Sequence, residues 1–72
     1  SFDIELEKEK VNTALKKLEI ETVKLSEKLN NKNFRKKAPE KIIEKFEADH
    51  EDLKVQLNKQ KVLLESLEQL NN

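Results

Sequence analysis

Apolar side chains recur along the first part of the chain at alternating spacings of three and four residues, which is typical of a coiled-coil seam. That seam runs through Ile4, Lys8, Val11, Leu15, Leu18, Thr22, Leu25 and Leu29. A second series has the same spacing and runs through Ile43, Phe46, His50, Leu53, Leu57, Gln60, Leu64 and Leu67. The pattern predicts two helices with one apolar face each, over about residues 3–29 and 39–70.

The segment of about residues 30–38 interrupts both series and is predicted to be the turn between the helices. Asn30, Asn31 and Asn33 are interpreted as turn residues, which tolerate left-handed backbone and bond local amides. Pro39 suits the first position of the second helix, and Glu40 complements the positive end of that helix dipole. The predicted fold is all-α, a two-helix antiparallel coiled-coil hairpin, forming one domain over residues 1–72.

In an antiparallel coiled coil, the a layer of one helix pairs with the d layer of the other. The two seams then match in seven layers: Leu25 with Ile43, Thr22 with Phe46, Leu18 with His50, Leu15 with Leu53, Val11 with Leu57, Lys8 with Gln60, and Ile4 with Leu64. Several apolar residues lie outside the seams, among them Ile20, Ile42, Val55, Val62, Leu63 and Leu70. They either widen the buried stripe or form a second packing surface.

The composition lacks several residue types that enzyme active sites commonly use. The 72 residues are 35% hydrophobic and 42% charged, with no Gly, Cys, Met, Trp or Tyr, so a disulfide, a thiolate metal site and a glycine-rich phosphate loop are excluded. The single histidine, His50, cannot assemble a zinc site alone and is interpreted as a seam residue. We expect no catalytic residue, metal, cofactor or small-molecule substrate in this domain. No apolar run approaches the roughly 20 residues of a membrane span, so a cytoplasmic location is expected.

Charge is distributed unevenly along the chain. Lys and Arg together number 15, as do Asp and Glu, yet residues 28–41 hold six basic residues and one acidic one. Lys28 and Lys32 lie near the C-terminal end of the first helix, where cations are favourable. Lys36, Lys37 and Lys41 lie at or just before the start of the second helix, where cations are mildly unfavourable. A polyanion-binding tip and a merely solvated turn both account for the cluster. The candidate phosphate contacts are Lys32, Arg35, Lys36, Lys37 and Lys41.

Phe34 is the aromatic residue of this basic segment. Such a ring can stack on an unpaired nucleobase, for roughly 1–3 kcal/mol. It can instead cap the coiled coil above Leu29 and the Ile42–Ile43 turn, where burial is favourable. Tip packing is the commoner role, and Arg35 is then the better candidate for contact with a ligand.

The tip also resembles a known family. The residues that carry the resemblance are Lys28-Leu29-Asn30-Asn31, Asn33-Phe34 and Lys37-Ala38-Pro39, followed by the apolar pair Ile42 and Ile43. They are similar to the hairpin tip of the C-terminal coiled-coil arm of valyl-tRNA synthetases, which usually reads Lys-Leu-Ser-Asn, Phe and Lys-Ala-Pro. Asn30 stands where serine is usual, and Arg35 stands where an apolar residue is common.

The resemblance implies a tRNA-binding appendage, a fragment of a larger valine–tRNA ligase that acts in protein biosynthesis. Its basic tip would contact the outer corner of valine tRNA, where the D and T loops meet, and position the tRNA for aminoacylation. The aminoacylation site would lie in the other domains of the parent enzyme, so the isolated domain would not be an enzyme. The alternative from the residues alone is a structural coiled-coil module for dimerisation or protein docking.

Overall fold

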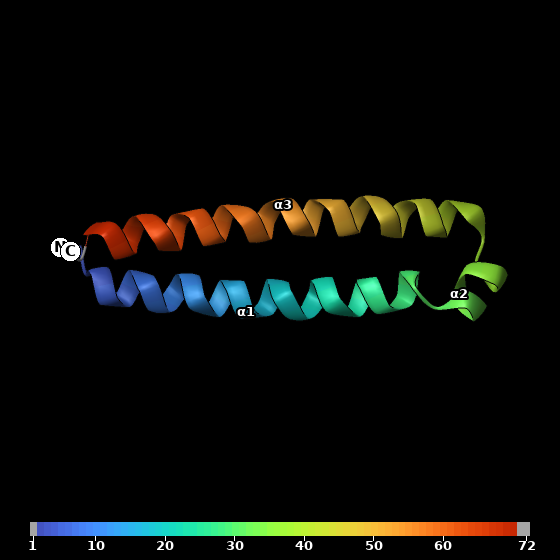
Figure 1. Cartoon of the computed structure of the whole chain (residues 1–72), viewed down its shortest axis with the longest axis horizontal. Coiled ribbons are helices and arrows are strands. Elements are labelled where there is room, and N and C mark those ends of the chain that lie inside the picture. Colours follow the sequence, from blue (N-terminus) through green and yellow to red (C-terminus); the bar gives the residue numbers. More distant parts are fainter. Residues whose placement is uncertain (1, 71–72) are drawn as a thin grey trace.

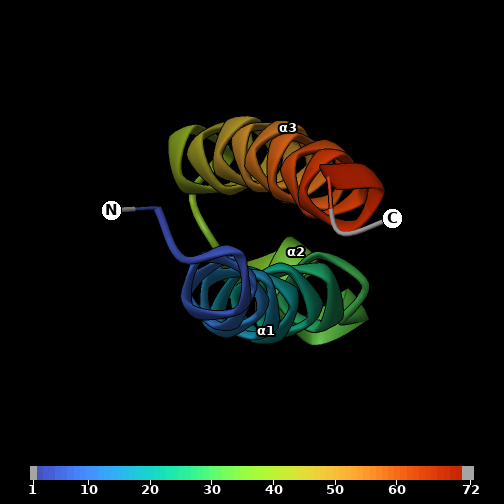
Figure 2. The ribbon, with the colours of Figure 1, turned by 90° about the vertical axis from the view of Figure 1, so that its left-hand side faces the viewer.

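The computed structural model describes residues 2–70, which form an elongated hairpin measuring 52 × 18 × 14 Å (Figure 1). Its helices are α1 (Ile4–Leu29), α2 (Lys32–Lys37) and α3 (Glu40–Leu70). Helices α1 and α3 run antiparallel and pack side by side along their length, and α2 lies at the end where the chain turns (Figures 1 and 2). The predicted all-α hairpin is confirmed, and both long helices begin and end within one residue of the expected bounds.

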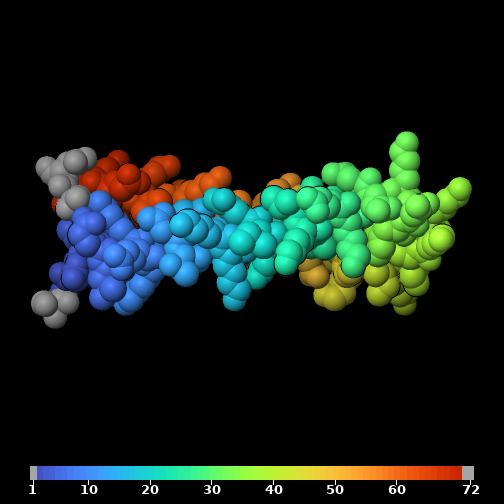
Figure 3. Space-filling view, turned by 90° about the horizontal axis from the view of Figure 1, so that it is seen from below, coloured from blue at the N-terminus to red at the C-terminus, as the bar shows by residue number. Residues whose placement is uncertain are grey.

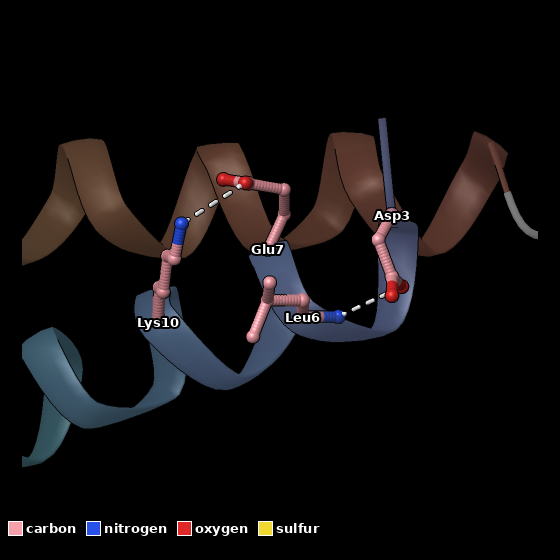
Figure 4. A network of polar contacts seen from close by, with 4 residues as sticks. All are labelled: Asp3, Leu6, Glu7 and Lys10. Carbon is pink, nitrogen blue, oxygen red and sulfur yellow. Dashed lines mark hydrogen bonds and ion pairs between the residues drawn. The ribbon is translucent and has the colours of Figure 1, made fainter. Parts of the chain in front are cut away.

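Helix α1 begins at a well-defined N-cap. The carboxylate of Asp3 accepts a hydrogen bond from the backbone amide of Leu6 at 3.1 Å, which satisfies one of the unpaired amides of the first turn. Glu5 and Glu7 place negative charge at the positive end of the helix dipole. Lys10 reaches back to Glu7 with an Nζ–Oε1 distance of 3.4 Å (Figure 4). The cap and the charges together define where the rod starts.

The apolar faces lie where the sequence predicted them. Each of the sixteen seam residues, eight in α1 and eight in α3, is buried or half-buried. The best-buried cluster consists of Val11, Leu15 and Leu67, with Leu57 and Leu64 packed against it. The polar seam residue Thr22 is satisfied within α1, because its hydroxyl donates to the carbonyl of Leu18 at 2.6 Å.

The predicted register between the two helices is wrong. It set Val11 against Leu57, which leaves Leu67 ten residues, or about 15 Å, further along α3 at 1.5 Å per residue. In the structure, Leu67 belongs to the same buried cluster as Val11. Near the tip, Lys28 rather than Thr22 lies over the ring of Phe46, at 5.9 Å from its centroid. The contacts correspond to a displacement of one heptad along α3.

The displacement follows from the structure of the turn. The predicted register requires α3 to start level with the end of α1, but its first turns extend past that end and lie over α2 (Figure 1). Helix α2 thus occupies the space beyond the end of α1, opposite the first turns of α3. Each residue of α1 is therefore paired with a residue further along α3. Because the apolar pattern repeats every seven residues, this shift leaves every seam residue on the seam.

The six apolar residues named above as lying outside the seams do not widen the buried stripe. Each remains exposed: Ile20 at 57%, Ile42 at 39%, Val55 at 53%, Val62 at 53%, Leu63 at 44% and Leu70 at 65%. Of the two interpretations of these residues, the wider stripe is therefore wrong.

The turn itself is helical rather than irregular. Asn31 caps α2, because its side-chain oxygen accepts from the amide of Phe34 at 3.1 Å. Asn30 ends α1 with φ −89° and ψ −5°, and no residue between 2 and 70 has the positive φ that asparagines in a turn would tolerate. Pro39 precedes α3 rather than opening it, and its carbonyl accepts the first helical hydrogen bond, from Ile43 at 3.2 Å.

Candidate nucleic-acid interface

The tip is built around two stacked aromatic rings. Phe34 of α2 and Phe46 of α3 lie with their centroids 5.5 Å apart and their planes within 8° of parallel. The ammonium of Lys28, at the end of α1, lies 5.6 Å from the centroid of Phe34 and 5.9 Å from that of Phe46. Cation–π attraction favours this placement. These three residues, one from each helix, therefore meet at the tip, and Phe34 packs inside the hairpin.

Arg35 ties the same three helices together by hydrogen bonds. Its Nε donates to the carbonyl of Leu29 at 2.5 Å, which pairs one of the carbonyls left open at the end of α1. Its Nη2 lies 3.4 Å from Oε2 of Glu47 in α3. The sequence makes Arg35 the leading candidate for contact with a ligand. The structure shows that its guanidinium already has two partners within the chain.

The remaining candidate cations have no such partners. Lys32, Lys36 and Lys37 lie on α2, and Lys41 lies in the first turn of α3; all four are exposed. The ion pairs that join side chains within residues 2–70 include none of these lysines. These four lysines therefore carry positive charge that no ion pair within residues 2–70 neutralises. They lie at one end of the rod, where side chains project outward in Figure 3.

The helix dipoles act on these lysines differently from what the sequence predicted. From the sequence, Lys36 and Lys37 are expected just before the start of the second helix, where a cation is unfavourable. They occupy the last turn of α2, whose negative dipole end favours them. Only Lys41 lies in the first turn of the long helix that follows. Helix dipoles alone therefore do not require a bound anion at the tip.

The tip has two chemically different sides. A hollow of about 410 Å³ beside Arg35 contains carboxylates, and its lining is Ser26, Leu29, Asn30, Arg35, Glu47, His50 and Glu51. A second hollow, of about 390 Å³, lies on α2 and contains no carboxylate; it is lined by Asn31, Asn33, Phe34, Lys37 and Ala38. The charge of its lining therefore suits the second hollow better than the first to a polyanion.

One carboxyl group near the first hollow has a shifted pKa. The hydrogen bond from Lys54 lowers the pKa of Glu51 below its ordinary value of 4.5, and the charge of Lys54 and of His50 adds to this. The Lys54 Nζ lies 2.7 Å from Oε1 of Glu51. The group stays ionised at neutral pH, so it contributes negative charge to that side of the hairpin.

The same part of the chain shows no metal centre and no membrane span. Among residues 2–70, no group of three or more His, Cys, Asp or Glu side chains is arranged to hold a metal ion. None of the three helices is both long and apolar enough to cross a membrane.

Sequence reasoning missed several parts of the tip. Phe46 was interpreted only as a seam residue, Glu47 was not singled out, and Asn31 was not recognised as a helix cap. The Asn31–Phe34 spacing is a cap signal present in the sequence, since an N-cap side chain bonds an amide two or three residues ahead. The pairing of Phe34 with Phe46 was hidden by the wrong register.

Comparisons with known proteins agree on one family. A family model described as the valyl tRNA synthetase tRNA binding arm matches residues 3–71. The chain is 37% identical over 67 residues to a valine–tRNA ligase of Lacticaseibacillus casei. That alignment covers 93% of this chain but 8% of the relative's length. No solved structure matches.

Proposed function

We propose that this chain, which belongs to the valyl-tRNA synthetase tRNA-binding arm family, binds tRNA through the lysines at its tip as part of a valine–tRNA ligase. The observation that carries this proposal is the cluster of Lys32, Lys36, Lys37 and Lys41 without ion-pair partners in residues 2–70. Lysine supplies point charge to phosphate, and such contacts dominate nucleic-acid affinity.

The shape of the hairpin suits an appendage that reaches a distant part of its ligand. The tip lies at one end of the 52 Å rod, and the first turn of α1 lies beside the last turn of α3 at the other (Figure 1). A parent enzyme joined at that other end would hold the lysines far from its own surface. The proposed contact is the outer corner of valine tRNA, and holding that corner would position the acceptor end for aminoacylation.

The chemistry itself is assigned to the rest of the parent protein. The chain spans 8% of the length of its relative, and no metal-binding cluster occurs among residues 2–70. We therefore propose that the domain alone contributes binding and no catalysis. The cytoplasmic location expected from the sequence belongs to the same proposal.

The test is a titration of the 72-residue chain with folded tRNA, followed through backbone amide NMR signals at two salt concentrations. Signals of residues 28–41 are expected to shift, and the affinity is expected to fall with salt, because bound cations displace counterions from phosphates. The slope of log affinity against log salt is negative. Replacing Lys36 and Lys37 by alanine should make it less steep, by about 0.7–0.9 for each phosphate that the protein no longer neutralises.

The matched control is the double variant Lys16→Ala and Lys17→Ala, which removes the same charge from the exposed middle of α1. It should leave the salt slope unchanged. Equal decreases of the slope in both double variants, or shifts spread along the shaft, would contradict a tip interface and leave only general charge attraction.

A second function is supported by the exposed apolar residues on the outer faces of both long helices, such as Ile20 and Val55. They favour a module that docks on another protein or on a second copy of the chain. Sedimentation of the chain alone would reveal a concentration-dependent mass if self-association is the function. A constant monomer mass, with tRNA binding at the tip, would exclude dimerisation.

A further inference from the structure

The hollow on α2 is shallow and open, with room for one planar group to lie against its surface. Its volume of about 390 Å³ falls within the range of roughly 300–1,000 Å³ that small-ligand sites occupy. It lies on the lysine-bearing helix and shares no lining residue with the hollow that contains Glu47 and Glu51. It is therefore a separate feature of the tip.

An aromatic ring held in a fixed position forms part of its wall. One face of Phe34 is stacked on Phe46, and the backbone amide of Phe34 donates the cap hydrogen bond to Asn31. The side chain is half-buried, and what remains accessible lines the hollow. A ring fixed in this way loses little conformational freedom when a planar group packs against it.

Amide groups supply polar contacts beside the ring. Asn33 is exposed, and no hydrogen bond from its side chain occurs within the described chain, so its carboxamide offers both donors and an acceptor. The oxygen of Asn31 is used by the cap, which leaves its NH₂ group. Carboxamides match the edges of nucleobases, which present neighbouring donors and acceptors.

Lysine side chains near the ring and the amides favour a ligand with negative charge. Lys37 is in the wall of the hollow, and Lys32 and Lys36 lie on the same six-residue helix without ion-pair partners in residues 2–70. A ligand that satisfies ring, amides and lysines together combines a planar polar group with a phosphate backbone.

We propose that this hollow receives one unstacked nucleobase from an RNA loop. The base packs on the accessible surface of Phe34, its edge meets the carboxamide of Asn33, and the adjoining phosphate lies at Lys37. The inference rests on the proposed function, since the tip lysines bring the RNA to the hollow. An acidic peptide would engage the lysines but would leave the ring and the amide unused.

The experiment compares three RNA probes with the same number of phosphates: a hairpin with a single-stranded loop, the same hairpin with abasic loop positions, and a blunt duplex. The looped hairpin should bind about 5- to 150-fold more tightly than the other two, because stacking of a base on an aromatic side chain is worth about 1–3 kcal/mol. The side-chain NH₂ signals of Asn33 should shift only with the looped hairpin.

Two variants locate the effect in the hollow. Asn33→Ala should reduce the preference for the looped hairpin and leave duplex affinity unchanged, and it is not expected to affect folding because Asn33 is exposed. Phe34→Leu keeps an apolar side chain in the tip while removing the aromatic surface, and should have the larger effect. Asn58→Ala, at an exposed position of α3, is the control and should bind all three probes like the parent chain.

Equal affinity for the looped and abasic hairpins would overturn the inference, as would a polyglutamate peptide that shifts the Asn33 NH₂ signals as RNA does. In either case the proposed function has its own separate test, the variant Lys36→Ala. If that variant weakens binding of every RNA probe while the loop preference is absent, the lysine interface stands and the nucleobase site does not. If Lys36→Ala changes nothing, the lysine interface has failed.

Discussion

Arg35 holds the end of α1 by donating a hydrogen bond from its Nε to the carbonyl of Leu29 at 2.5 Å. The two residues are six positions apart and lie on either side of the turn between α1 and α2. The last carbonyls of a helix lack intrahelical partners, so a charged donor at this point stabilises both the helix end and the turn. This hydrogen bond joins the end of α1 to α2.

Arg35→Ala is expected to lower the free energy of unfolding by about 1–2 kcal/mol, chiefly through removal of the hydrogen bond to Leu29. The ion pair with Glu47 adds little, since both side chains are about half exposed. Arg35→Lys should restore only a small part, because a lysine cannot present two fixed donors. Urea unfolding followed by circular dichroism measures both, with Lys36→Ala as control. Full stability in Arg35→Ala would show that the hydrogen bond contributes nothing.

The stacked rings should be energetically coupled. In a double-mutant cycle of Phe34→Leu and Phe46→Leu, a coupling free energy of about 0.5–1.5 kcal/mol is expected, because parallel aromatic pairs contribute that much beyond their buried area. Each value comes from thermal or urea unfolding. A second cycle, of Phe34→Leu with Leu57→Ala, provides an uncoupled reference. Leu57 packs against the buried cluster of Val11, Leu15 and Leu67 and not against Phe34. Additive effects of the two phenylalanine substitutions would mean that the stack has no specific energy.

The sequence predicted the faces of the long helices because the seam spacing repeats over many turns in each of them. Sixteen positions followed one rule, and each is buried or half-buried. The register could not be obtained from the same rule, since shifting one helix by seven residues puts seam residues opposite seam residues again. Good agreement between layers was therefore weak evidence for any one pairing.

The tip was harder to predict, for a different reason. Helix α2 has only six residues, less than two turns, so it shows no periodicity, and helices this short are unstable alone. Its existence depends on the cap from Asn31, the stack of Phe34 on Phe46 and the hydrogen bond of Arg35 to Leu29. The last two join residues of different helices. The composition of the segment nevertheless predicted correctly where the chain turns and where basic residues concentrate.

The ion pair of Glu51 and Lys54 predicts a small acid-dependent decrease of stability. The hydrogen bond and then the charge of Lys54 lower the pKa of Glu51 in the folded chain. A group whose folded pKa is depressed stabilises the fold above its unfolded pKa, and this contribution disappears as pH falls through the folded value. Side-chain NMR titration should therefore give Glu51 a pKa below 4.5. Lys54→Met should return this pKa toward 4.5, whereas Lys59→Met, further along α3, should not change it.

Leu67 provides a direct test of the register. It is 6% exposed and packs with Val11 and Leu15, so Leu67→Ala should lower the free energy of unfolding by about 2–5 kcal/mol, the usual range for a buried leucine. In the register predicted from the sequence, this side chain would lie beyond Ile4, where α1 offers no apolar partner, and its removal would cost little. Leu63→Ala is the matched control, because Leu63 is 44% exposed on the same helix. Similar small decreases in the two variants, measured by urea unfolding, would favour the pairing of Val11 with Leu57. The position of α2 would then not determine how the two long helices pair.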